Sequence, residues 1–123
     1  MRRSHWRRGP ALSVALAALF ALAVVGTAGA RSTVSATTVH VTATDFAYKL
    51  TSKTVKPGRV TFVIKNASPA LHDFAIGGHS SKTIGPGKTT RLTVMLKPGR
   101  YLYQCTVDSH AELGMKGFLR VRG

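Results

Sequence analysis

Apolar and polar residues alternate along most of the chain after residue 38. Such alternation, with a period of two, is typical of strands that bury one face. The clearest alternating runs are residues 39–44, 60–65, 90–97, 101–105 and 119–121. Turns rich in Gly and Pro separate the runs, and no stretch has a convincing helical period. The pattern therefore predicts one all-β domain over residues 39–123, folded as an antiparallel β-sandwich or barrel.

The first thirty residues have a different pattern. Four arginines within the first eight residues precede an apolar run over residues 11–25, and small residues follow at 26–30. A basic start, an apolar middle and an Ala-x-Ala end are typical of a secretory signal peptide. We expect cleavage after Ala30, a flexible lead-in over residues 31–38, and an extracytoplasmic location (secreted, periplasmic or attached to the cell envelope). The alternative is an uncleaved anchor, because about 20 apolar residues span a bilayer. The export route, Sec or twin-arginine, stays open.

The composition is strongly basic, with 18 Lys and Arg against four Asp and Glu and a formal net charge of +14. Fourteen of the basic residues and all four acids fall in residues 31–123, which leaves this part at +10. Such a charge favours partners with acidic surfaces and association with anionic membrane surfaces. The basic residues are scattered, without a Lys/Arg block or a nucleic-acid motif, so we expect no nucleic-acid partner. We expect the domain to be a monomer.

The only cysteine, Cys105, ends one of the alternating runs, and His110 and Met115 follow it in a loop. A strand-loop-strand hairpin places such loop residues around a common point at one end of a sandwich. Thiolate and thioether ligands stabilise Cu(I), and imidazole suits both oxidation states, so one further histidine would complete a blue-copper ligand set. Zinc also accepts Cys and two His, but a functional zinc site more often adds a carboxylate or a second thiolate than a methionine.

The fourth ligand has to come from another strand. His72 is the best candidate, because it lies where a loop gives way to a strand. We expect His40 to point outward from an early strand, His79 to lie in a turn, and Met95 to lie on the surface. The prediction is one copper ion of the type 1 class with four ligands: His72, Cys105, His110 and Met115.

Over nearly the whole domain, the chain resembles the cupredoxins, in particular the small plastocyanin- and azurin-like blue-copper proteins. The segments that carry the resemblance are Val55-Lys-Pro-Gly58, the strand ending at Asn66, His72-Asp73-Phe74, residues 98–105 and residues 110–117. One feature departs from both subgroups: the spacing here is Cys-x4-His-x4-Met, which neither plastocyanins nor azurins have. The subgroup and the reduction potential therefore stay open.

The resemblance implies a Greek-key β-sandwich with one type 1 copper. In that fold His72, Cys105 and His110 would be the equatorial ligands, and Met115 the weak axial ligand. Two further roles are implied by the resemblance. Asp73 would support the cysteine sulfur by a hydrogen bond, and Asn66 would tie the ligand loops together.

The function that follows is one-electron transfer between extracytoplasmic redox proteins, a donor and an acceptor with acidic surfaces. His110 would be the electron exit, within an apolar docking patch formed by Leu71, Ala111 and Leu113. We expect no enzymatic activity, because the chain has no His-rich second copper site and no acid/base pair. A copper carrier or buffer is the alternative, although carriers usually expose clusters of Met and His. A third possibility is a structural or adhesive exported domain.

Overall fold

The computed structural model describes residues 9–11, 13, 15, 18 and 21–123, and it divides the chain into two units, residues 1–31 and 32–123. Fourteen of the thirty residues of the predicted signal peptide lie outside the described residues, so the segment and its cleavage stay predictions. Within the described part of the chain, no helix is long and apolar enough to cross a membrane.

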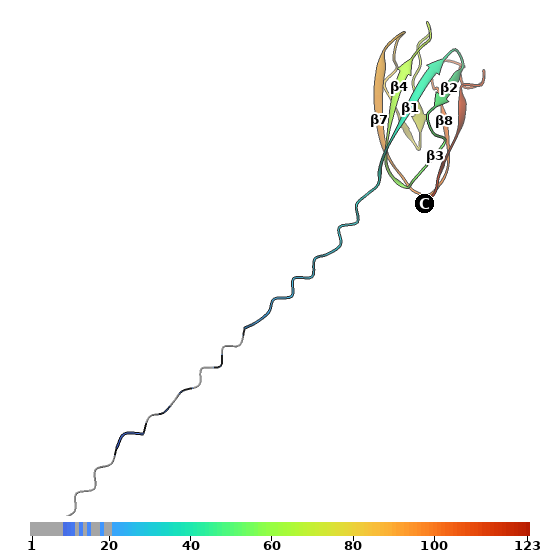
Figure 1. The fold of residues 1–123 in the computed structure, drawn as a ribbon. Coiled ribbons are helices and arrows are strands. Elements are labelled where there is room, and N and C mark those ends of the chain that lie inside the picture. Colours follow the sequence, from blue (N-terminus) through green and yellow to red (C-terminus); the bar gives the residue numbers. More distant parts are fainter. Residues whose placement is uncertain (1–8, 12, 14, 16–17, 19–20) are drawn as a thin grey trace, which may run out of the picture. The chain divides into compact units, whose positions relative to one another are not determined.

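Nine strands form the second unit, and Figure 1 shows them as two facing layers. The strands are β1 (Ala36–Thr44), β2 (Ala47–Leu50), β3 (Thr54–Val55), β4 (Gly58–Asn66), β5 (Ala75–Ile76), β6 (His79–Ser80), β7 (Thr89–Leu96), β8 (Gly99–Gln104) and β9 (Lys116–Val121). The long strands coincide with the alternating runs of the sequence. The expectation for His79 was wrong in one respect, because this residue lies in the short strand β6 and not in a turn.

Both sheets are mixed, which corrects the expectation of a purely antiparallel sandwich. The first sheet has the order β2-β1-β4-β7, and the second has the order β3-β9-β8-β5-β6. Strands β1 and β4 pair in parallel, as do β3 and β9, and all other neighbours are antiparallel. The parallel pair β1–β4 arises because the chain crosses to the second sheet at β3 before it returns. The result is an all-β sandwich of two mixed sheets.

The core lies between the sheets and follows the period-two pattern. Val60, Phe62 and Ile64 of β4 are fully buried, whereas the residues between them are partly exposed. A column of aromatic rings joins the layers: Phe62 lies 5.0 Å from Phe74 between ring centres, and Phe74 stacks on Tyr103 at 5.5 Å. Because these rings come from both sheets, they fix the separation of the layers at the level just below the predicted ligands.

The predicted ligands all belong to connections at one end of the sandwich. Cys105 follows β8 directly and Met115 precedes β9 directly, so the β8–β9 ladder closes the loop between them. His72 lies in the connection between β4 and β5. An isolated bridge to Ile84 holds it there. We call this end of the domain, with the β1–β2 turn beside it, the ligand pole.

Candidate metal centre

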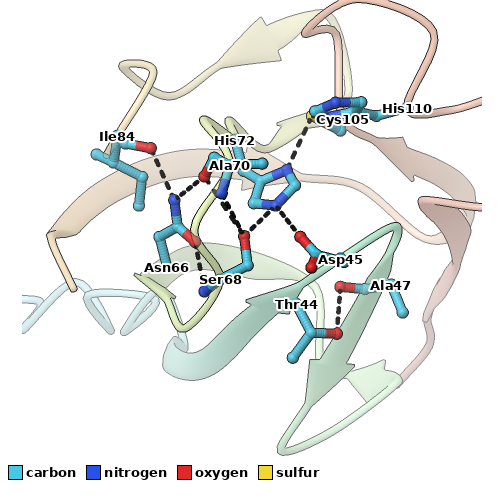
Figure 2. A network of polar contacts seen from close by, with 10 residues as sticks. All are labelled: Thr44, Asp45, Ala47, Asn66, Ser68, Ala70, His72, Ile84, Cys105 and His110. Carbon is cyan, nitrogen blue, oxygen red and sulfur yellow. Dashed lines mark hydrogen bonds and ion pairs between the residues drawn. The ribbon is translucent and has the colours of Figure 1, made fainter. Parts of the chain in front are cut away.

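Three side chains converge at the ligand pole although they are far apart in sequence. The ligand atoms of His72, Cys105 and His110 all lie within 4.8 Å of one another. The Cys105 Sγ atom lies 3.9 Å from His72 Nδ1 and 3.7 Å from His110 Nδ1. Both histidines therefore present the same ring nitrogen to the sulfur, and Figure 2 shows His72 facing Cys105.

These distances fit a metal ion of small radius. Bonds of about 2.3 Å to sulfur and 2.1 Å to nitrogen, at angles between tetrahedral and trigonal, separate the two donor atoms by about 3.6–3.8 Å. The observed separations of 3.7 and 3.9 Å are close to this range. The three donors are thus already arranged around a common point.

Met115 completes the donor set from the loop side. It is fully buried and belongs to a small cluster with Cys105 and Ala43, separate from the main core. Two backbone hydrogen bonds fix its position, from Cys105 N to Met115 O and from Met115 N to His110 O, both 3.0 Å long. The positive φ of Gly114, 106°, allows the turn that brings the chain back. The side chains of His72, Cys105, His110 and Met115 form a cluster typical of a type 1 copper site.

A hydroxyl group that the sequence analysis missed orients His72. Ser68 Oγ lies 2.7 Å from His72 Nε2, and it also accepts a hydrogen bond from Ala70 N at 3.2 Å. Its own proton can go to Ala70 O at 3.4 Å. With this arrangement the imidazole carries its proton on Nε2 and keeps the lone pair of Nδ1 for a metal. Asp45 Oδ1, 4.0 Å from the same Nε2, favours the same tautomer.

Asn66 ties the loop that carries Ser68 and His72. Its amide nitrogen donates to Ala70 O at 2.7 Å and to Ile84 O at 2.9 Å, and its amide oxygen accepts from Ser68 N at 2.9 Å. Asn66 is fully buried, so these three bonds satisfy groups that water does not reach. All three bonds lie on the His72 side of the ligand pole, so the tying of the ligand loops by Asn66 stays a prediction.

Asp73 acts on the residue after the cysteine. Its carboxylate accepts hydrogen bonds from Thr106 N at 2.7 Å and from the Thr106 hydroxyl. Among the described contacts, none joins Asp73 to the Cys105 sulfur, so the hydrogen bond implied by the resemblance stays a prediction. The observed bonds connect the His72 connection to the end of β8. They hold Cys105 at a fixed position relative to His72.

Tyr48 of β2 closes the site from the first sheet. Its hydroxyl donates to the backbone oxygen of Asp73, and its ring packs against the small cluster of Cys105 and Met115. Burial, and next the negative charge of a Cys105 thiolate, raise the pKa of Tyr48, so the phenol stays protonated. Nothing in the sequence pattern singled out this tyrosine, because alternating strands contain many aromatic residues.

The two histidines differ in their access to solvent. His72 is fully buried, whereas His110 is half-buried. Burial, followed by the charge of His110, lowers the pKa of His72 and favours the neutral ring that a metal needs. An exposed aromatic side chain covers part of His110: the Phe46 ring centre lies 5.1 Å from the imidazole centre. Phe46 has a positive φ of 61° in the β1–β2 turn, a conformation that is unusual for a bulky residue.

The remaining predicted positions lie as follows. His40 and His79 are exposed and stand apart from the cluster, and Met95 is 60% exposed on β7. Leu71 and Leu113 are 54% and 59% exposed at the ligand pole, and Ala111, two residues before Leu113, is half-buried. The sequence analysis did not identify four neighbours of the ligands: Asp45, Phe46, Tyr48 and Ser68. Of these four, only Ser68 could have been identified from the sequence, because it is a polar residue two positions after the asparagine that ends a strand.

Comparison with known families agrees with this geometry. A family described as the cupredoxin-like domain matches residues 12–120. This chain belongs to the cupredoxins. No curated protein matches its sequence.

Solved structures share the fold of this cupredoxin at low sequence identity. The dithionite-reduced auracyanin of Roseiflexus castenholzii is 23% identical with a TM-score of 0.61, over 73% of this chain and 99% of that chain. Auracyanin A, a "blue" copper protein of Chloroflexus aurantiacus, is 19% identical with a TM-score of 0.60, over 72% and 100%. A multicopper oxidase of Campylobacter jejuni is 15% identical with a TM-score of 0.58, over 71% of this chain but 30% of the oxidase.

Proposed function

We propose that this cupredoxin is an exported electron carrier, which passes single electrons between redox partners through one copper ion. The observation that supports the proposal most directly is the ready-made donor set, with His72 Nδ1, Cys105 Sγ and His110 Nδ1 within 4.8 Å of one another. When bound, copper supplies a one-electron couple between Cu(I) and Cu(II). Two sulfur donors and two imidazoles suit both oxidation states.

The protein contributes rigidity around these donors. His72, Cys105 and Met115 are at most 1% exposed, the Ser68 hydroxyl accepts a hydrogen bond from His72, and Asn66 holds the same loop. Packed interiors resist displacement of their side chains. A donor set that keeps one arrangement in both oxidation states has little to reorganise when an electron moves, which favours rapid exchange.

His110 offers the route to a partner. It is the most accessible of the three clustered ligands. The exposed Phe46 packs against its ring, and Leu71 and Leu113, 54% and 59% exposed, lie in the connections that carry the two histidines. Transient redox encounters use small interfaces, which a rim of this kind can form. The charge of +10 on residues 31–123 would speed the approach of a partner with an acidic surface.

A copper carrier is the other candidate, and burial argues against it. A protein that hands over its metal needs accessible ligands, whereas the sulfur ligands Cys105 and Met115 are 1% and 0% exposed. Export, cleavage after Ala30 and the absence of enzymatic activity belong to the same proposal as the electron-carrier role.

Voltammetry of the copper-loaded protein tests the proposal. An electron carrier gives a reversible one-electron wave that persists over repeated cycles, without loss of copper to a Cu(I) chelator in the solution. A carrier or buffer would release copper to the chelator each time the ion is reduced, and the wave would decay. That decay would contradict the proposed function.

A further inference from the structure

Three cations gather on the outer face of the second sheet. Lys53, Arg100 and Arg120 line a hollow of about 250 Å3 together with Thr54 and Phe118. Arg100 and Arg120 are direct partners across the β8–β9 ladder. The Arg100 guanidinium carbon lies 3.7 Å from the centre of the Phe118 ring. We call these five residues the basic hollow.

The charge of the basic hollow is not balanced within the domain. Like charges directly opposite one another in a sheet are destabilising, and no ion pair joins these cations to a carboxylate among residues 21–123. The four acids of the chain lie beside the metal ligands or in their loops, at the ligand pole: Asp45, Asp73, Asp108 and Glu112. An anion from outside the chain would remove the repulsion.

Apolar side chains are interleaved with these cations. Leu102 and Phe118 are cross-strand partners on the same outer face, and they are 42% and 47% exposed. Lys116 continues the row of cations along β9 and is exposed as well. Surfaces that alternate cations with exposed apolar side chains suit the lipid-water interface, where the cations contact phosphates and the apolar groups reach the acyl boundary.

We propose that the basic hollow, with Leu102 beside it, docks the domain onto the anionic phospholipid surface of a membrane. A membrane fits these observations better than an acidic protein does. The exposed side chains of Leu102 and Phe118 can enter the acyl boundary of a membrane. A membrane is also a continuous anionic plane, which attracts every cation of the domain that lies within a Debye length of about 10 Å. An acidic patch on a partner protein would interact only with the cations of the basic hollow itself.

The position of the basic hollow gives the docked domain a defined orientation. The β8–β9 ladder runs from Gly99 and Val121 at one end to Gln104 and Lys116 at the other, next to the ligands Cys105 and Met115. Arg100 is five residues from Cys105 along the chain, or about 17 Å in an extended strand. In Figure 1 the C-terminus marks the end opposite the ligand pole. Docking through the basic hollow therefore leaves His110 open to partners, and the proposal does not depend on the electron-carrier role.

Vesicle binding by residues 32–123 tests the proposal. This unit contains all nine described strands and both core clusters, and it excludes the apolar leader. Binding is measured by co-sedimentation with vesicles of phosphatidylglycerol and phosphatidylcholine, and with vesicles of phosphatidylcholine alone. The test variant is Arg100→Gln/Arg120→Gln. The matched control is Arg59→Gln/Arg91→Gln, which removes the same charge from exposed positions of the first sheet.

The proposal predicts binding to the anionic vesicles only, weakened about thirtyfold in the test variant and far less in the control. Equal weakening in both variants would overturn it, since attraction would then depend on net charge alone. Equal binding to neutral vesicles would overturn it too. So would a test variant that loses binding to soluble polyglutamate but keeps binding to vesicles, because the partner would then be an acidic polypeptide. Lys53→Gln, at an exposed loop position, replaces the double variant if that variant does not fold.

Discussion

Replacing Ser68 with alanine isolates the contribution of one hydroxyl group to the metal centre. Ser68 Oγ lies 2.7 Å from His72 Nε2, and both residues are buried, so water cannot take the place of the hydroxyl. In the metal-free variant the imidazole is free to move its proton to Nδ1. The metal-bound state needs the Nδ1 lone pair and therefore keeps the proton on Nε2. In the variant this proton faces only Asp45 Oδ1, at 4.0 Å and beyond hydrogen-bond distance, which destabilises the metal-bound state alone.

The magnitude follows from the cost of that unpaired group. A buried donor without a partner costs about 1–3 kcal/mol, and loss of a hydrogen bond to a ligating histidine lowers metal affinity by about 10–100-fold. The two figures agree, because each tenfold step in affinity is about 1.4 kcal/mol. We therefore expect Ser68→Ala to bind copper about 10–100-fold more weakly.

Competition against a chromogenic copper chelator measures this affinity. The control is Ser109→Ala, in the same ligand loop as Cys105 and His110, because Ser109 is exposed and its side chain makes no hydrogen bond to the described residues. The control should keep the affinity of the unchanged protein. An affinity for Ser68→Ala within twofold of the control, about 0.4 kcal/mol, would refute the role of the hydroxyl in orienting His72.

Substitutions at three further positions test the supports of the site by denaturant unfolding of the metal-free protein. Asn66→Ala should lower the free energy of unfolding by about 3 kcal/mol, because it removes two buried hydrogen bonds and a partly buried one; a loss below about 1 kcal/mol would contradict this. Gly117→Ala should cost about 1–3 kcal/mol, because the new Cβ would lie 2.5 Å from Cζ of the buried Tyr103; an unchanged midpoint would show that the ring can move. Phe46→Gly should change stability by no more than about 1 kcal/mol, because relief of left-handed strain offsets the lost ring contact. Phe46→Val should be clearly less stable than Phe46→Gly, and equal stabilities would contradict the strain argument.

Much of the fold and the donor set could be predicted from local sequence. Alternation placed the long strands, since residues such as Val60, Phe62 and Ile64 have to face one side of a strand to be buried together. The short spacing from Cys105 to Met115 limited these donors to one loop. His72 required a resemblance or an argument from position, because nothing local brings residue 72 to residue 105.

The remaining features depend on contacts that sequence patterns do not encode. The parallel pairing of β1 with β4 results from the path of the chain between the sheets. Ser68, Tyr48 and Phe46 reach the site through turns and strand ends, where their residue types are common for other reasons. Gly117 is a further case: the structure shows that the position next to Tyr103 has no room for a side chain, which the alternating pattern does not indicate.

We expect Cys105, two histidines and Met115 to bind one redox-active copper ion. Visible absorption and electron spin resonance of the Cu(II)-loaded protein measure this binding, with Cys105→Ser as the comparison. The loaded protein should have an intense visible band from thiolate to copper and a narrow copper hyperfine splitting, both absent in Cys105→Ser. A Cys105→Ser protein that keeps the visible band would contradict the ligand assignment.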